Sequence, residues 1–206
     1  MFRSGETPLP PSGDPGNRTA RVFFRNSPLY AAQGIMVYFS TMKTFVYHGS
    51  DIEVRKPEIR RANRALDFGM GFYTTLNLDQ ATSFARKVRE RNGSAFAIVS
   101  VYSIDLDALR TAFDLLAFEH PDEAWLDFVS DNRTGNFTGA LHDAVLGPVA
   151  NDTIFKTFIA YQNGTLTKAE TIERLKVRPL YNQLVFKTER ALSLLSFERS
   201  FAVEES

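Results

Sequence analysis

Two short stretches of this 206-residue chain combine glycines with residues that could contact a ligand. Residues 46–50 read VYHGS and carry His48 next to a glycine. Residues 66–75 read LDFGMGFYTT, in which Gly69 and Gly71 precede an aromatic and hydroxyl-bearing run. Glycine is favoured where the backbone must adopt a positive φ or approach a ligand closely. Both stretches are therefore candidates for a binding site built from backbone and side chains together.

Neither stretch is a known phosphate-binding motif. The Gly69-x-Gly71 pair lacks the third glycine and the strand-to-helix context of a dinucleotide fingerprint. It also lacks the Gly-Lys-Ser/Thr of a P-loop. Taken alone, residues 66–75 indicate a glycine-rich turn that leads into a short strand.

Composition excludes several kinds of site. The chain has no cysteine, so disulfides, thiolate metal sites and a cysteine nucleophile are excluded. Three histidines give little scope for a histidine-rich metal site, and we expect no metal. Lysine plus arginine and aspartate plus glutamate are equal at 24 each, so no overall charge favours nucleic acid or an anionic membrane. No segment has the apolar length of a signal peptide or a membrane span, and we expect a soluble, cytoplasmic protein with no membrane partner.

The order of predicted elements favours an α+β fold. Residues 1–41 are predicted to be a poorly ordered extension, since their first part is rich in proline, glycine and serine, and residues 42–206 to be a single domain. Strand patterns cover residues 44–47, 94–102, 143–149 and 181–188, and a closing strand falls within 191–203. Helices are predicted from Asn77 to Gly93, as short turns over 105–116, from Pro121 to Ser130, after Asn151 or Asp152, and from a Thr167/Glu170 capping box. Residues 51–65 and 131–139 are predicted loops.

Four sequence blocks in this order resemble a known group of proteins. They are VYHGS, LDFGMGFYTT, DAVLGPVAND (residues 143–152) and QLVFKTERAL (residues 183–192). The group consists of bacterial domains of unknown function in the ADP-ribosyltransferase superfamily, in the branch with a His–Tyr–Glu signature. The resemblance spans residue 45 to about residue 197. It implies a split pair of small antiparallel sheets around an NAD cleft, with flanking helices.

The resemblance implies a role for each matching position. His48 would hydrogen-bond the adenosine ribose of NAD, and the Gly49 backbone would bond the nicotinamide amide. The Tyr73 ring would stack against the nicotinamide. Further cofactor-binding positions implied in the same two blocks are Ser50, Gly71, Phe72 and Thr74.

Gln183 stands where this branch has glutamate. A carboxylate there would bond the ribose 2′-hydroxyl and also stabilise the positive charge that develops at C1′, whereas glutamine can supply only the hydrogen bond. Loss of such an electrostatic contribution costs about 10²–10³ in rate, and glutamine cannot act as a general base. Three outcomes stay open: the acceptor is already nucleophilic, another carboxylate such as Asp143 or Glu189 reaches the site, or catalysis is lost.

Other polar residues have simpler interpretations. Asp67 and Asp143 fit structural roles, in a turn and at a loop end. A cluster of three arginines (Arg60, Arg61, Arg64) could meet the NAD pyrophosphate or a nucleic-acid acceptor, although a solvated loop explains it equally. Tyr181 replaces the acidic or amide residue of the arginine-modifying branch, which disfavours arginine as the acceptor.

The leading hypothesis is an NAD-dependent mono-ADP-ribosyltransferase of bacterial toxin or toxin–antitoxin type, with His48, Tyr73 and Gln183 as its catalytic residues. Its partners would be NAD, a protein or nucleic-acid acceptor and an antitoxin protein. One alternative is a catalytically weak module that binds NAD or ADP-ribose. Two others are an RNA 2′-phosphotransferase-like enzyme and a toxin half whose observable behaviour is antitoxin binding.

Overall fold

A computed structural model describes residues 28–30, 36–38, 43–59, 66–149, 152–176 and 181–204. The chain divides into two compact units, residues 1–40 and residues 41–206. In the first unit, β1 (Pro28–Tyr30) and β2 (Met36–Tyr38) form an antiparallel pair. The predicted disorder of residues 1–41 falls mostly outside the described residues and stays a prediction.

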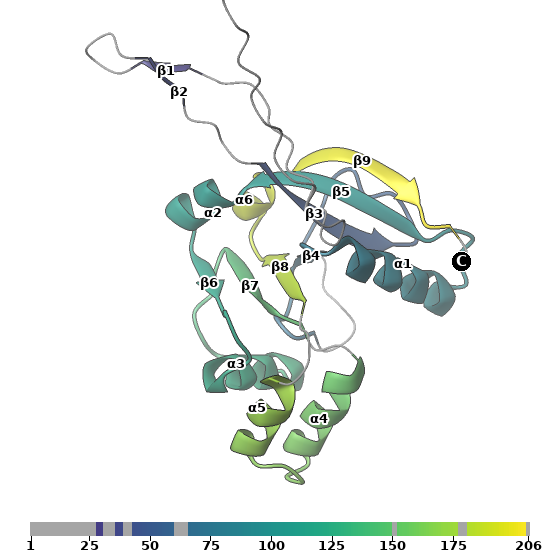
Figure 1. Cartoon of the computed structure of the whole chain (residues 1–206), viewed down its shortest axis with the longest axis vertical. Helices are drawn as coiled ribbons and strands as arrows, with labels where there is room; N and C mark the ends of the chain where they lie inside the picture. Colours follow the sequence, from purple (N-terminus) through teal and green to yellow (C-terminus); the bar gives the residue numbers. More distant parts are fainter. Residues whose placement is uncertain are drawn as a thin grey trace, which may run out of the picture. The chain divides into compact units, whose positions relative to one another are not determined.

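The second unit contains all the other elements (Figure 1). Its strands are β3 (Lys43–Ser50), β4 (Phe72–Thr75), β5 (Ile98–Asp105), β6 (Leu115–Ala117), β7 (Ala144–Pro148), β8 (Asn182–Phe186) and β9 (Ser196–Ala202). Its helices are α1 (Leu78–Asn92), α2 (Leu106–Ala112), α3 (Glu123–Thr134), α4 (Asp152–Gln162), α5 (Lys168–Lys176) and α6 (Glu189–Leu192).

The seven strands form one mixed sheet in the order β6-β7-β8-β4-β3-β5-β9. The β6–β7 pair is parallel, and the other neighbours are antiparallel. Since helices and strands do not alternate strictly along the chain, the α+β prediction is confirmed. The finer prediction, a split pair of small sheets around an NAD cleft, stays a prediction.

The backbone pairing between neighbouring strands is shortest in the middle of the sheet, between β3 and β4. Along β3 and β5, eight residue pairs lie opposite one another, from Lys43–Asp105 to Ser50–Ile98. Within the described chain, β3 and β4 share one such pair, Tyr47 and Thr75. Among the described residues, the backbone ladder between the two halves of the sheet thus consists of one residue pair.

Different helices cover different parts of the sheet. Side chains alternate between the faces of a strand, so Tyr73 and Val185 lie on one face of β4–β8, and Phe72 and Phe186 on the other. The first face packs against α3, α4 and α5 in a core that includes Trp125. The helices α3, α4 and α5 lie together beyond the ends of β6 and β8, and α1 lies under β3 and β5 (Figure 1).

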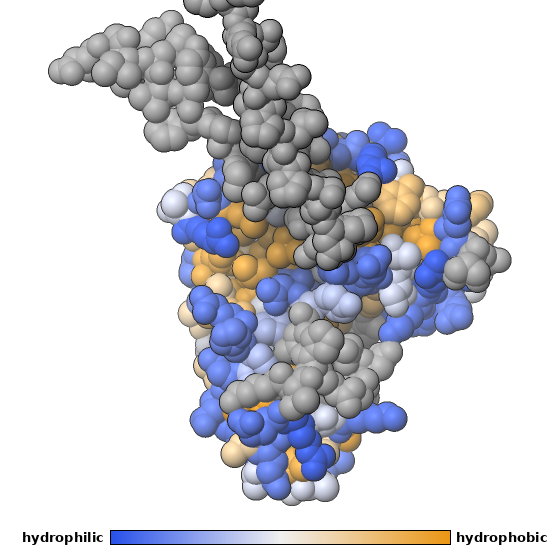
Figure 2. Space-filling view, viewed as in Figure 1, coloured by the Kyte–Doolittle hydropathy of each residue, from blue (hydrophilic) through white to orange (hydrophobic). Residues whose placement is uncertain are grey.

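The opposite face carries a second core of aliphatic and aromatic side chains around Phe72, Tyr102 and Phe186. Several of its members are only half-buried, among them Leu115 and Leu194. The space-filling view accordingly shows hydrophobic residues over α6 and the adjoining strands, bordered by hydrophilic ones (Figure 2).

Helix α1 is confirmed, and its N-terminus is capped through an unexpected relay. The Asn77 side chain accepts from the Gln80 backbone N–H at 2.8 Å, as predicted. The Gln80 side chain, however, reaches the Thr75 hydroxyl, and that hydroxyl accepts the Asn77 backbone N–H at 3.1 Å. The usual reciprocal bond of a capping box therefore passes through Thr75. Gly93 ends the helix with φ of 64°.

Several predicted boundaries are wrong. The strand predicted over residues 94–102 is β5, which begins four residues later and ends at Asp105, where that carboxylate caps α2. Helix α3 continues four residues into the predicted loop, to Thr134, and Gly135 at φ 76° ends it. The short strand β6 was missed at the end of residues 105–116 and extends one residue beyond them, since three residues beside β7 give too short a pattern.

Gly49 explains how closely α1 packs on β3. A Cβ at Gly49 would lie 2.2 Å from the backbone oxygen of Ala81 and 2.8 Å from the Ala85 nitrogen, both in α1. We expect Gly49→Ala to lower the free energy of unfolding by about 3 kcal/mol, because helix backbone cannot move aside as a flexible side chain can. Urea denaturation measures it. Gly93→Ala, where φ is positive but no atom lies within 4 Å of a Cβ, is the control and should cost about 1 kcal/mol. A Gly49→Ala protein as stable as the wild type would contradict this packing.

Candidate functional site

His48 lies where β3 and β4 separate. Its Nδ1 is 2.7 Å from the carbonyl oxygen of Tyr73, and its ring stacks on Phe72 with centroids 4.6 Å apart. A carbonyl only accepts, so Nδ1 carries the proton, and in the neutral ring Nε2 has the lone pair. In the described residues, the backbone ladder between β3 and β4 consists of the Tyr47–Thr75 pair. The His48 imidazole thus forms a side-chain bond to β4 next to the end of this ladder.

Tyr73 is half-buried, and its hydroxyl is used by its own turn. The hydroxyl donates to the Gly69 carbonyl at 2.6 Å and accepts from the Phe68 N–H at 3.2 Å. Gly69 has φ of 71°, and its N–H bonds the Leu66 carbonyl at 3.1 Å. The hydroxyl of Tyr73 therefore has a structural function, because it holds the turn together.

The same turn is fastened to other elements. Lys187 donates from Nζ to the Phe68 carbonyl at 2.5 Å, and burial lowers the pKa of Lys187. Asp67 accepts from Nε and an Nη of Arg133 in α3 at 2.6 and 2.5 Å, and both side chains are largely buried. The contact with Arg133 links the turn to α3, whereas the sequence predicted a role for Asp67 within the turn itself. Both contacts reach the same carboxylate oxygen, Oδ1, and such charge-assisted bonds are stronger than neutral ones.

Gln183 lies on β8 opposite Thr75 on one side and Gly147 on the other. Its side chain is half-buried, and none of the described residues hydrogen-bonds to its carboxamide. Since Tyr73 is two residues from Thr75, Tyr73 and Gln183 share a face, one diagonal step apart.

His48 neighbours Tyr47 in sequence, so its side chain leaves β3 toward the other face. The three predicted catalytic residues therefore meet on adjacent strands, but not on one face.

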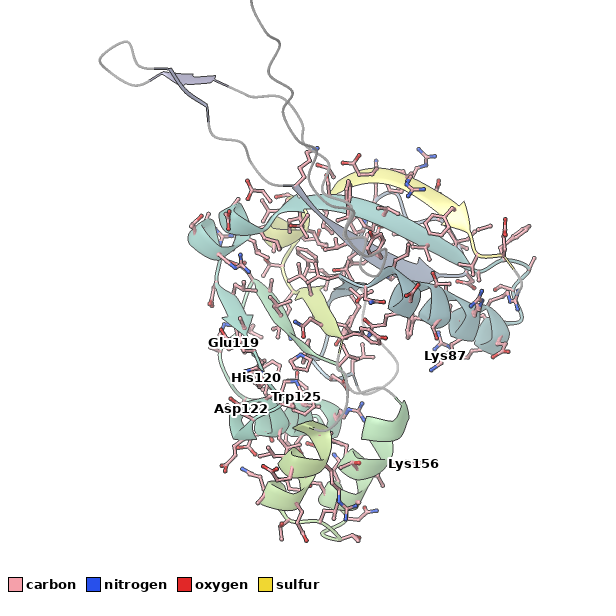
Figure 3. The ribbon with its side chains drawn as sticks, viewed as in Figure 1. Lys87, Glu119, His120, Asp122, Trp125 and Lys156 are labelled. Atoms are coloured by element: carbon pink, nitrogen blue, oxygen red, sulfur yellow. The ribbon has the colours of Figure 1, made fainter. Side chains whose placement is uncertain are left out.

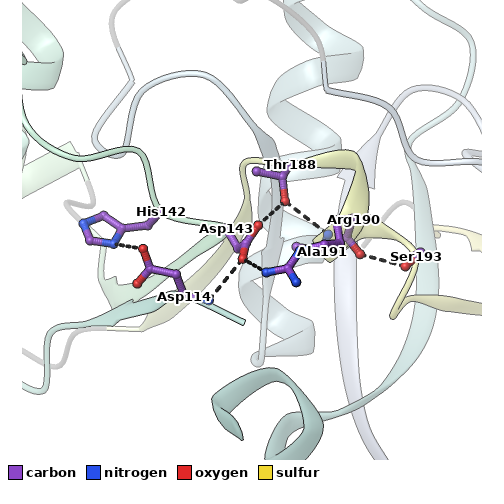
Figure 4. Close-up of polar contacts among 7 residues, drawn as sticks. All are labelled: Asp114, His142, Asp143, Thr188, Arg190, Ala191 and Ser193. Carbon is purple, nitrogen blue, oxygen red and sulfur yellow. Dashed lines mark hydrogen bonds and ion pairs between the residues drawn. The ribbon is translucent and has the colours of Figure 1, made fainter. Parts of the chain in front are cut away.

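Neither carboxylate considered as a substitute comes close to Gln183. Asp143 precedes β7, four residues from Gly147, or about 13 Å along the strand. It accepts hydrogen bonds from Arg190, from the Thr188 hydroxyl at 2.6 Å and from the Asp114 N–H at 3.1 Å (Figure 4). These bonds lower the pKa of Asp143 to about 2, with the bond from Arg190 as the largest cause. Glu189 is exposed and begins α6 beyond the end of β8. The structural role predicted for Asp143 agrees with these contacts.

The remaining predicted cofactor-binding residues all have partners within the protein. The Ser50 hydroxyl donates to Asp51 at 3.3 Å, and Phe72 is buried against His48 and Tyr102. A Cβ at Gly71 would lie 2.6 Å from the Phe186 carbonyl oxygen, so close strand packing requires this glycine. Thr74 is buried and donates to the Leu184 carbonyl at 2.7 Å. Their contacts with NAD stay predictions, and the arginine cluster at residues 60, 61 and 64 lies outside the described residues.

Two residues of this region, Lys187 and Arg133, were missed by sequence reasoning. Lys187, Arg133 and the hydroxyl of Thr75 hold the turn and the strands in place. Lys187 lies in the block QLVFKTERAL, within the strand predicted over residues 181–188, and this position could have drawn attention to it. Arg133 gave no signal, because nothing in the sequence links α3 to a turn 66 residues earlier.

The described residues hold no group of three or more His, Asp or Glu side chains placed to bind a metal ion. His120 lies beside Asp122 and Trp125, at the start of α3 (Figure 3). His142 bonds Asp114 through Nδ1 at 3.0 Å. In the part of the chain that the structure describes, no helix has the length and apolarity to cross a membrane.

Comparison with known protein families identifies the family of this chain. Residues 44–197 match the family of proteins of unknown function DUF3990, and the chain belongs to this family. The matched range contains all four sequence blocks that carried the resemblance, which confirms a domain family of unknown function over this part of the chain. Neither the curated proteins nor the solved structures gave a significant match.

The bonds of Asp143 predict a pH-dependent contribution to stability. The folded pKa of about 2 is below the ordinary 3.8, so the contribution is fully present above about pH 4 and is lost as the pH falls through about 2. We expect Asp143→Asn to cost about 1–3 kcal/mol of unfolding free energy at pH 7. The difference from wild type should shrink between pH 4 and pH 2, measured by urea denaturation at each pH. Asp107→Asn, at an exposed carboxylate in α2, is the control. A difference that is constant with pH would show that the charge of Asp143 has no part in it.

Proposed function

We propose that this protein is an NAD-dependent mono-ADP-ribosyltransferase. The observation that carries the proposal is that His48, Tyr73 and Gln183 lie on three neighbouring strands of the sheet, β3, β4 and β8. They surround the β3–β4 junction, where the described backbone pairing is shortest. Along the chain, these residues follow the order on which the resemblance to the His–Tyr–Glu branch rests: a histidine in the first strand, a tyrosine after a glycine-rich turn and a residue on a late strand.

The junction between β3 and β4 supports a cleft at this position. Past the Tyr47–Thr75 pair, the backbone of Gly49 and Ser50 has no β4 partner in the described ladder, while β5 pairs with both residues on the other side. A strand edge that is free on one side offers N–H and C=O groups to a planar amide such as nicotinamide. The divergence also allows a ligand to contact His48 and Tyr73 together, although their side chains leave the sheet on different faces.

In the proposed reaction, nicotinamide stacks on the Tyr73 ring and is held by the Gly49 backbone. An acceptor oxygen or nitrogen attacks C1′ of the nicotinamide ribose, the C1′–N bond breaks, and nicotinamide leaves with the electron pair. His48 would hold the adenosine ribose, and Gln183 would hydrogen-bond the nicotinamide ribose. The half-buried Gln183 carboxamide supports this role, because no described residue occupies its hydrogen-bonding groups.

A second candidate function is a module that binds NAD or ADP-ribose without turnover. Gln183 favours it, because an amide cannot stabilise positive charge at C1′ as a carboxylate does. No residue of β3, β4 or β8 is acidic. Asp143 and Glu189 lie away from Gln183, so neither supplies the missing carboxylate. Two of the three alternatives considered from sequence then remain: an acceptor that is already nucleophilic, or a loss of catalysis.

The test is incubation of the full-length protein with labelled NAD, alone and with bacterial lysate. Nicotinamide release and transfer of label to protein or nucleic acid are followed in parallel. We expect transfer by the wild type, its loss in Tyr73→Ala, and release up to about 100-fold faster in Gln183→Glu, since the carboxylate restores the missing charge.

Tyr73→Phe is the matched control, because it keeps the ring but removes the two hydrogen bonds to the turn. It should melt at a lower temperature than wild type and keep most of the transfer activity. Saturable NAD binding without release by the wild type, together with release by Gln183→Glu, would favour the binding module. A wild type that neither binds nor cleaves NAD would reject both candidates.

A further inference from the structure

Two consecutive buried threonines of β4 bond the backbone on both sides of Gln183. Thr74 donates from Oγ1 to the Leu184 carbonyl at 2.7 Å, and Thr75 lies with Oγ1 3.1 Å from the Asn182 carbonyl. The two carbonyls belong to the residues immediately before and after Gln183. Both threonines are almost fully buried, with 2% and 5% of their surface exposed.

Packing and strand propensity alone do not account for this pair. Valine has the same shape as threonine and suits a buried strand position at least as well. A buried hydroxyl is costly unless it is hydrogen-bonded, and here each hydroxyl lies within hydrogen-bond distance of a β8 carbonyl, one on each side of Gln183. The two bonds restrict how the β8 backbone can shift or rotate at Gln183.

The Thr75 hydroxyl also connects β8 to the start of α1. It accepts the Asn77 N–H at 3.1 Å and bonds the Gln80 side chain. Because Thr75 is also the residue that pairs with Tyr47 of β3, its position is fixed from three directions. Any displacement of the sheet junction would therefore be passed on to Gln183.

We propose that Thr74 and Thr75 are positioning residues that hold Gln183 in place for the reaction, an inference that rests on the proposed ADP-ribosyltransferase function. Neither hydroxyl has to touch NAD, because each acts through the backbone of β8. This differs from the cofactor contact expected for Thr74 from sequence, since its hydroxyl is bonded to Leu184.

The experiment compares Thr74→Val and Thr75→Val with Thr74→Ser and Thr75→Ser in the full-length protein. Thr171→Val is the matched control, because Thr171 is fully buried in α5 and donates to the Thr167 carbonyl at 2.8 Å, in a helix that contributes no predicted site residue. For each protein, the melting temperature, kcat and KM for NAD cleavage are measured.

We expect the two valine variants at β4 to lower kcat by about 10- to 100-fold, as small displacements of a reacting group do, with KM changed by less than about threefold. The serine variants should recover most of this loss. Thr171→Val should lower the melting temperature and leave kcat unchanged. Valine variants at β4 that lower the melting temperature but keep wild-type kcat would overturn the inference. A wild type that does not bind or cleave NAD would instead reject the proposed function, and the inference with it.

Discussion

The architecture depends on the contact between β3 and β4 at Tyr47 and Thr75. This pair is the whole of the described ladder between two half-sheets that are otherwise paired over several residues each. A single pair is weak by itself, and side chains reinforce it. His48 bonds the Tyr73 carbonyl on one side of the pair, and the Thr75 hydroxyl joins β8 and the start of α1. One side-chain to backbone bond, from His48, therefore crosses the junction beside the backbone pair, and the Thr75 hydroxyl fixes the β4 side of that pair.

The four sequence blocks interact with one another in the structure. His48 from the first block bonds Tyr73 in the second, and the second accepts Lys187 from the fourth at the Phe68 carbonyl. The fourth block also supplies Thr188 and Arg190 to Asp143 of the third, the network drawn in Figure 4. Such a set can be required for folding alone. The joint occurrence of the four blocks is therefore evidence for this family's domain. Evidence for an activity has to come from polar groups that take no part in the bonds between the blocks.

Gln183 is such a group. Its neighbours before and after it on β8 are bonded through their carbonyls, and its own carboxamide has no described partner. The Tyr73 hydroxyl, by contrast, is bonded to the turn, and its half-buried ring packs against the core that includes Trp125. A ligand site is expected where polar groups are held in position without being satisfied, because an apolar residue would otherwise serve as well.

The sequence predicted local structure where the signal is local. The capping residues of α1 and α5 and the alternation in β8 identified those elements, because each depends on neighbours within a few residues. Contacts between distant segments were beyond reach: the Asp67–Arg133 pair, the Lys187 bond to the turn, and the single pair between β3 and β4. The role of Gly49 shows the same limit. A glycine beside a histidine is compatible with ligand binding, yet the structure explains it first by the backbone of α1.

The charge at the site limits what chemistry the proposal can include. With an amide at position 183 and no acidic residue on β3, β4 or β8, the ribose would develop positive charge beside a neutral group. Asp143 cannot be recruited without breaking its bonds to Arg190 and Thr188, and its pKa of about 2 reflects how strongly those bonds favour the charged form in place. Charge compensation would then have to come with the acceptor. An ionised phosphate or carboxylate brings its own negative charge to C1′ and needs no general base, whereas a neutral hydroxyl or amine brings neither. Within the proposed function, an anionic acceptor is therefore the one whose chemistry fits a glutamine at this position.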